Sequence, residues 1–222
     1  MQYLADALAT IPLLVDGLIL TIQVCGLAVA VALVGAIALL AAQRSGRYWL
    51  ILPVRGFVSL MRGLPIVVLV FLLYFGLPAL LGTGRISAFW VGVAALGMNG
   101  AAFISELLRG AIARLPDGQR DAARALGLGW WSTWRLVLVP QMLPIALPAL
   151  AGEIGFIIKA SPVLSLITLV DLTRRAQQVT MQTFDPLAPL IAAAVLYFLL
   201  IGAVAAGMRW LERRVQPQAA QR

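Results

Sequence analysis

The feature that most constrains this chain is a set of long apolar runs that contain no charged residue. Four such runs, at 17–42, 63–84, 86–105 and 187–208, each hold the roughly 20 residues that an α-helix needs to cross a bilayer. A fifth, from Leu136 to about Ile158, is interrupted by Glu153. Only 12% of the residues are charged, against about 25% in soluble domains. The runs predict an all-α membrane protein with about five transmembrane helices.

The chain divides into three parts on this pattern. Residues 1–16 carry Asp6 and Asp16 but no basic residue, unlike a signal peptide, so we expect them to form an extracytoplasmic amino-terminal segment. Residues 17–208 form the predicted transmembrane domain. Residues 209–222 form a predicted cytoplasmic basic tail.

The basic residues fix the expected orientation. With the amino terminus outside, thirteen of the 17 Lys and Arg residues fall in inner segments, and the exceptions are Arg85, Lys159, Arg174 and Arg175. The positive-inside rule therefore predicts an external amino terminus and a cytoplasmic carboxyl terminus. Topology and anionic lipid account for the net charge of +8, and nucleic-acid binding is not expected.

The longest inner loop, at about 109–135, contains a predicted short helix. Pro116 marks its entry, Asp117 is the expected N-cap, and Gly127 is placed where a helix ends in a left-handed residue. The helix, at about 118–126, gathers a small apolar face of Ala122, Ala123 and Leu126. Such a face suits the groove of a partner protein. It equally suits the lipid surface, with Trp130, Trp131 and Trp134 as interfacial anchors.

The residues after this helix resemble the signature loop of binding-protein-dependent ABC importer permeases. That pattern reads E-A-A, three residues, G, nine residues, then I-x-L-P; it falls here on Asp121, Ala122, Ala123, Gly127, Val137, Val139 and Pro140. Three further stretches, at 62–78, 104–127 and 172–177, are similar to the branch that imports polar amino acids and opines. Asp121 replaces the usual glutamate, and Pro162 and Val163 depart from the pattern after the fourth span.

The resemblance implies a type I ABC importer permease fold in the bacterial inner membrane. It makes the loop helix a coupling helix that docks on the ATPase through Asp121, Ala122, Ala123, Leu126 and Gly127. The implied partners are two ABC ATPase subunits, a second permease chain identical or different, an extracytoplasmic solute-binding protein and a small polar amino acid. ATP and Mg²⁺ would be bound by the ATPase, so no cofactor is expected in this chain.

Charged residues within the membrane need a partner or a water-filled path. Glu153 and Lys159 are candidates for the translocation pathway together with Ser161, because Pro162 makes a straight helix doubtful at this point. A buried pair joining two helices is the alternative. Glu106 is a further pathway candidate, although Arg109, three residues on, favours a local ion pair. A carboxylate in the path favours a cationic group, and the resemblance to histidine, arginine and opine systems implies a basic amino acid or opine as the substrate.

Arg174 and Arg175 fall in the last outer segment. An acidic patch on the solute-binding protein is one expected partner for them. Solvation, or an ion pair with Asp171, is the alternative.

Two rival classes remain. No Walker G-x-x-x-x-G-K-[ST] loop occurs, so ATP must be hydrolysed elsewhere. The chain has no histidine and one cysteine, Cys25, which excludes a Cys/His metal cluster and the ordinary Ser/His and Cys/His nucleophiles. An intramembrane hydrolase would have to use Lys159 with Ser161 or Ser165. A passive channel or scaffold is the other rival, and the loop spacing disfavours it.

Overall fold

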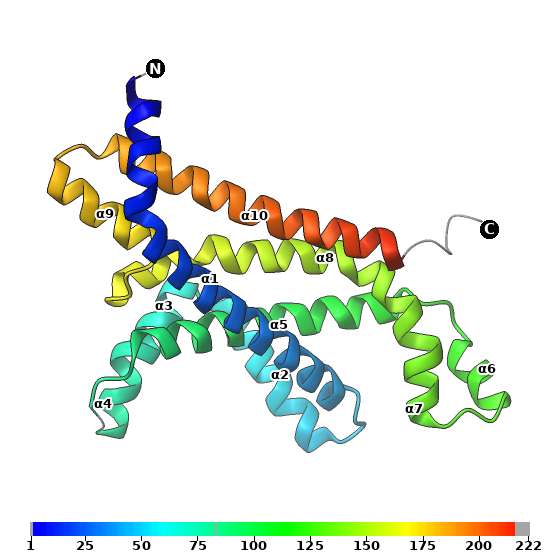
Figure 1. Ribbon diagram of the computed structural model, residues 1–222. Coiled ribbons are helices and arrows are strands. Elements are labelled where there is room, and N and C mark those ends of the chain that lie inside the picture. The colour runs from blue at the N-terminus through cyan, green and yellow to red at the C-terminus, as the bar shows by residue number, and fades with distance from the viewer. Residues whose placement is uncertain (1, 83, 216–222) are drawn as a thin grey trace.

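The computed structural model describes residues 2–82 and 84–215, so the part of the predicted tail at 216–222, with its Arg222, lies outside the described residues. Figure 1 shows an all-helical arrangement. The elements are α1 (Gln2–Gln43), α2 (Tyr48–Gly63), α3 (Ile66–Phe71), η1 (Leu72–Gly76), α4 (Leu77–Leu81), α5 (Ala88–Ala113), α6 (Gln119–Ala125), α7 (Trp130–Ser132), η2 (Thr133–Leu138), α8 (Val139–Ala160), η3 (Ser161–Ile167), α9 (Leu172–Thr183) and α10 (Leu187–Val215).

Four helical stretches are long and apolar enough to span a bilayer, at 6–43, 88–113, 130–167 and 187–215. A fifth span is completed by two helices, Tyr48–Gly63 and Ile66–Leu81, bent by 110° at their junction. The predicted five spans are therefore present when the bent pair counts as one.

The second span differs from the predicted run at 63–84. Its apolar outer half begins at Ile66, and α2 precedes it where the sequence suggested only an inner loop. The break falls at Pro65, which has no N–H and forces Leu64 into extended backbone (φ −88°, ψ 134°). Arg55 and Arg62 lie on α2 and interrupt its hydropathy, and for this reason apolar runs alone did not reveal it.

Residues 2–16 are helical and continuous with the first span in α1. Their extracytoplasmic location stays a prediction. Pro12 lies inside this helix.

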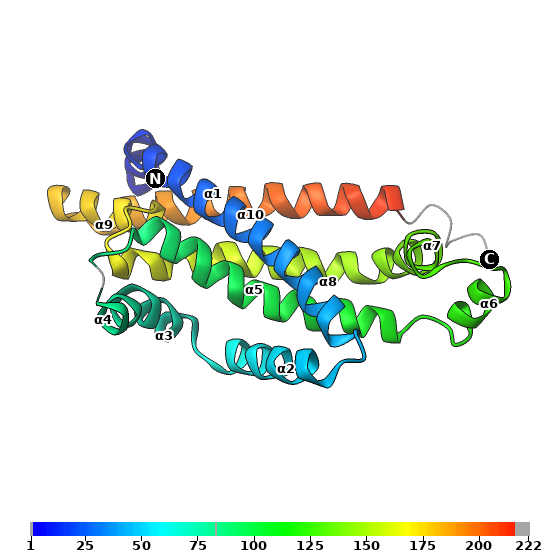
Figure 2. The ribbon, with the colours of Figure 1, turned by 90° about the horizontal axis from the view of Figure 1, so that it is seen from below.

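Small residues bring α1 and α5 into close contact. Ala28, Ala32 and Ala36 of α1 are fully buried. A Cβ added at Gly97 would lie 2.7 Å from Val31, and one added at Gly100 would lie 2.9 Å from Ile157 and 3.0 Å from Ala32. This spacing of small residues is how membrane helices gain packing without a hydrophobic driving force. The α1–α5 contact thus contributes much of the buried core, and Figure 2 shows α1 crossing α5 obliquely.

The two ends of the bundle carry different elements. In Figures 1 and 2, α6, α7 and the carboxyl end of α10 lie at one end, and the start of α1 lies with α4 and α9 at the other. The charge distribution makes the α6 end cytoplasmic and the α9 end extracytoplasmic.

Candidate coupling surface and translocation path

The predicted loop helix is present as α6, Gln119–Ala125. Gly127 has φ +75°, the left-handed conformation expected at its end, and the backbone N–H of Leu128 donates to the carbonyl of Ala123 at 3.0 Å. The expected N-cap is wrong: Gly118 occupies that position with φ +88°, and no side chain caps the helix. Glycine alone adopts this conformation without strain, so it displaces Asp117 from the role.

The residues predicted to dock on the ATPase do not all lie on the exposed face of α6. Ala123 is only 2% exposed, because α6 packs against η2 on this side. Leu126 is 80% exposed, and Asp121, Ala122 and Gly127 are also exposed. The surface that α6 offers to a partner therefore consists of Asp121, Ala122, Leu126 and Gly127, while Ala123 seats the helix on the protein.

Two side-chain contacts fasten α6 to the spans, and the sequence did not reveal either. The amide of Gln141 in α8 donates to Gln119 Oε1 at 3.1 Å. The guanidinium groups of Arg120 and Arg44 lie 5.8 and 5.6 Å from the centre of the Trp134 ring. One indole thus joins α6 to the cytoplasmic end of α1 by cation–π contacts. A displacement of α6 would be transmitted to two spans.

The alternative, in which α6 rests on the lipid surface, is supported by the tryptophans of the turn that follows it. Trp130 and Trp131 are exposed, next to α6, and stack with ring centres 6.3 Å apart. Trp134 instead takes part in the contact between α1 and α6.

The predicted pathway residues lie at the outer half of α8 and its junction with η3. The α-helix ends at Ala160 and continues as a 3₁₀ turn from Ser161, so the expected departure from a straight helix is present. Among the side chains that the structure describes, at 6–82 and 84–215, Glu153 Oε1 and Ser161 Oγ are the two buried atoms without a hydrogen-bond partner. Lys159 is exposed. In the described part of the chain it forms no ion pair with Glu153, so the structure gives no support to a buried pair.

Glu106 is held by a local network. Arg109 Nη2 lies 2.6 Å from Glu106 Oε2, Gln43 donates to Oε1 at 3.2 Å, and Arg62 lies 3.9 Å away. The expected ion pair with Arg109 is confirmed. These contacts join the ends of α1, α2 and α5, and a role for Glu106 in the pathway stays a prediction.

We expect Glu106→Gln to weaken this junction between helices. The change removes the charge from a side chain that is largely buried and leaves two guanidinium groups without their carboxylate. Because both arginines remain accessible to water, the loss should be about 1 kcal/mol, or roughly 2–4 °C in the thermal midpoint. Thermal unfolding of the purified chain in detergent measures this. Glu212→Gln, near the end of α10, is the matched control and should leave the midpoint unchanged.

The two outer arginines have different surroundings. Arg175 donates from Nε to the carbonyl of Leu13 at 3.0 Å, and its Nη2 lies 3.9 Å from Asp16 Oδ2. Arg174 is exposed, and its guanidinium donates to Gln177 Oε1 at 3.3 Å. Among the described residues neither guanidinium pairs with Asp171, which excludes that alternative here. Docking of a binding protein on these two residues stays a prediction.

Asp171, which the sequence suggested only as an ion-pair partner for these arginines, is a buried carboxylate. It is 1% exposed, caps α9 by accepting the backbone N–H of Arg174 at 2.9 Å, and accepts a long hydrogen bond of 3.5 Å from Tyr197. Burial raises the pKa of Asp171 from 3.8 to about 6, against the opposing effect of these hydrogen bonds. Only its position next to a helix start hinted at the capping role.

The raised pKa predicts that acid stabilises this end of the protein. The folded chain holds the proton more tightly than the unfolded chain, so the stabilisation is complete below about pH 4 and is lost as the pH rises through about 6. The protonation of Asp171 should contribute roughly 3 kcal/mol to the free energy of unfolding at low pH. Thermal midpoints measured from pH 4 to pH 7.5 should fall for the wild type and stay level for Asp171→Asn, which still caps α9. Equal slopes for the two proteins would contradict the prediction.

Residues 34–217 match the family described as the binding-protein-dependent transport system inner membrane component. The match covers most of the span-forming sequence, together with the coupling loop. The chain belongs to this family, and it is a multi-pass inner-membrane transport subunit rather than an enzyme.

Individual relatives agree with the family assignment. The chain is 35% identical to the arginine transport system permease protein ArtQ of Bacillus subtilis (strain 168), over 86% of this chain and 87% of the relative. It is 36% identical to the glutamine transport system permease protein GlnP of Escherichia coli (strain K12), over 93% and 94%. A solved amino acid ABC transporter with histidines is 31% identical with a TM-score of 0.85, over 96% of this chain and 99% of that chain. The predicted type I importer permease fold is confirmed.

Proposed function

We propose that this chain is the membrane-spanning subunit of an ATP-driven importer that carries a polar amino acid, and that the substrate is cationic. The names of the relatives, an arginine and a glutamine transport system, support an amino acid. Glu153 supports a positive charge on it, because a carboxylate oxygen buried in a span without a partner invites a cationic group. This orphaned oxygen is the observation that carries the choice of substrate. An opine with a basic side chain fits the same argument.

The proposed path runs along α8. Glu153 would meet the substrate, and Ser161 would contribute where α8 gives way to η3, since its hydroxyl is buried and has no partner. Lys159 is exposed on the same helix and would repel a cation, so in this proposal it does not contribute to binding the substrate. Glu106 is the weakest member of the set because its oxygens are already bonded.

Coupling would run through α6. A separate ATPase, present in two copies, would contact the exposed residues Asp121, Ala122, Leu126 and Gly127, while buried Ala123 keeps the helix seated. Movement of the ATPase would then pull on α8 through Gln119 and Gln141, and on α1 through Arg120, Trp134 and Arg44. A second permease chain would complete the path.

Delivery of the substrate would require an extracytoplasmic solute-binding protein. Arg174 is the better placed of the two predicted docking residues, because its guanidinium is exposed on α9, whereas that of Arg175 is tied to α1. Acidic residues on the binding protein would pair with it.

Uptake assays separate the proposal from its rivals. The chain is reconstituted in liposomes with and without its ATPase, and radiolabelled arginine, glutamine and an opine are followed with the binding protein present. The proposal expects uptake that requires ATP and the ATPase. Uptake independent of ATP would indicate a channel, and hydrolysis by the isolated chain would indicate an enzyme.

A further inference from the structure

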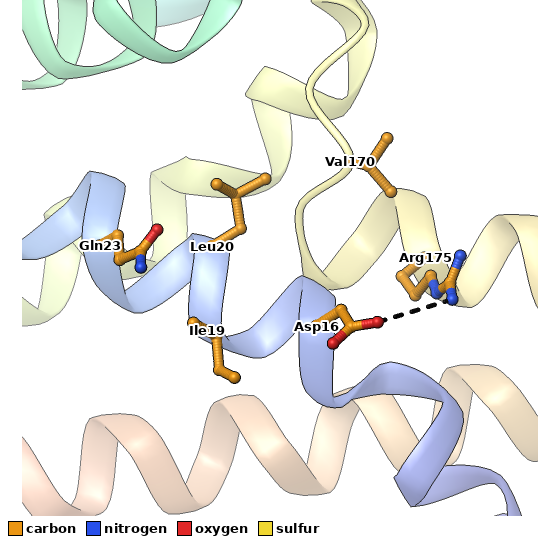
Figure 3. Close-up of a pocket in the computed structure, with 6 residues that line it drawn as sticks. All are labelled: Asp16, Ile19, Leu20, Gln23, Val170 and Arg175. Carbon is orange, nitrogen blue, oxygen red and sulfur yellow. Dashed lines mark ion pairs between the residues drawn. The ribbon is translucent and has the colours of Figure 1, made fainter.

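An open groove of about 340 Å³ lies between α1 and the segment that follows η3. Figure 3 shows its walls: Asp16, Ile19, Leu20 and Gln23 come from α1, and Val170 and Arg175 face them. The four α1 residues recur at i, i+3, i+4 and i+7, so they form one stripe along the helix axis. The groove therefore follows the outer part of the first span.

The chemistry of the groove changes with depth. Asp16 directly precedes the apolar run that begins at Gly17, so on this hydropathy pattern its carboxylate is expected near the lipid headgroups. Gln23 lies seven residues further along α1, about 10 Å deeper. Between these two polar groups the wall is formed by Ile19 and Leu20. The groove thus has charges at its mouth, an apolar wall below them and one amide.

Neighbouring contacts hold the groove in shape. The backbone N–H of Leu172 donates to Thr21 Oγ1 at 3.0 Å, and a Cβ added at Gly17 would lie 2.9 Å from the carbonyl oxygen of Asp171. Arg175 is oriented by its bond to Leu13 and by a 3.3 Å bond from Nη1 to Gln178. The two walls are therefore fixed before any ligand arrives.

The two charged groups at the mouth of the groove, Asp16 and Arg175, can each form further hydrogen bonds. Arg175 Nη2 lies 3.9 Å from Asp16 Oδ2, too far for a hydrogen bond. In the part of the chain that the structure describes, Nη2 has no hydrogen bond, and the Asp16 side chain is 87% exposed. A ligand carrying both an anion and a cation would satisfy the two groups together.

We propose that this groove binds a phospholipid of the outer leaflet whose headgroup carries a primary ammonium. The ammonium would donate to Asp16, and the phosphate would accept from Arg175 Nη2. The glycerol carbons would lie on Ile19, Leu20 and Val170, the Gln23 amide would donate to an ester carbonyl, and the acyl chains would continue deeper along the span. A protein docking from outside would reach the charged mouth but not the apolar wall, and so lipid is the occupant that matches the whole groove.

Native mass spectrometry of the full-length chain in detergent tests the proposal. The delipidated protein is titrated with phosphatidylethanolamine, phosphatidylcholine and phosphatidylglycerol of identical acyl chains. We expect phosphatidylethanolamine to be retained about fivefold more tightly than phosphatidylcholine, because a quaternary ammonium cannot donate to Asp16. Asp16→Asn should abolish this preference, and Arg175→Gln should weaken retention of all three lipids.

Two further variants complete the test, one as a control outside the groove and one inside it. Arg174→Gln removes the adjacent guanidinium outside the groove and should bind lipid like the wild type. Gln23→Leu preserves the charged mouth and should weaken all three lipids even if Arg175→Gln fails to fold. Equal retention of the ethanolamine and choline lipids by the wild type would overturn the proposal. So would an unchanged preference in Asp16→Asn, or equal effects of Arg174→Gln and Arg175→Gln.

Discussion

Replacing Gly127 with valine should abolish ATP-driven uptake while leaving the chain inserted in the membrane. Gly127 ends α6 with φ +75°, a region that costs a β-branched residue about 1–2 kcal/mol or more. The strained turn would reorganise, and the exposed Leu126 beside it would change position. We expect uptake by the complete transporter to fall more than tenfold, with membrane insertion unchanged.

Gly129→Val is the matched control for this change. Gly129 lies two residues on, and at both glycines an added Cβ would meet nothing within 4 Å. It adopts φ −65° and ψ 167°, which any residue tolerates. Its valine variant should therefore transport normally. Equal losses in the two variants would show that bulk, rather than the turn that positions α6, limits uptake.

The second large effect is expected at Glu153. Glu153→Gln preserves size and removes the charge, so a cationic substrate would lose a charge-assisted partner of about 1.5–3 kcal/mol. Arginine uptake should fall roughly 10- to 100-fold. Stimulation of the ATPase by the loaded binding protein should persist, because α6 is untouched.

Glu212→Gln serves as the control for Glu153→Gln, since it removes a carboxylate from the far end of α10. It should leave arginine uptake unchanged. Wild-type uptake in Glu153→Gln would sink the proposed cationic substrate without affecting the family assignment. Loss of both uptake and ATPase stimulation would indicate a folding defect, which thermal unfolding of the variant would reveal.

Hydropathy predicted the spans whose helices are apolar throughout, and it failed where polarity is mixed. The run at 187–208 corresponds to α10, Leu187–Val215. By contrast, α2 carries Arg55 and Arg62 and was read as a loop, and α9 is too polar to resemble a span. Hydropathy found the apolar part of the second span at 63–84 but not its bend at Pro65, although the proline itself is visible in the sequence.

The candidate site shows the same division between local and long-range information. Local signals predicted α6, because its glycine and its spacing lie within a few residues of one another. The burial of Ala123 against η2 and the contact of Arg44 and Arg120 with Trp134 depend on tertiary packing. No periodicity within the loop encodes them. Glu153 is conspicuous in the sequence because it is a charge in an apolar run, whereas the burial of Asp171 depends on the packing of α9 and has no local signal.

The central claim is that α6 is the surface on which the ATPase acts. Leu126→Cys places a thiol on its exposed face, and the native Cys25 is buried, so background reaction should be low. Cysteine cross-linking in the assembled transporter should join this residue to the ATPase subunit, whereas Leu80→Cys, exposed at the opposite end of the bundle, should give no such product. A Leu126→Cys chain that never cross-links to the ATPase, or that reacts with a membrane-impermeant thiol reagent added from outside, would contradict the account.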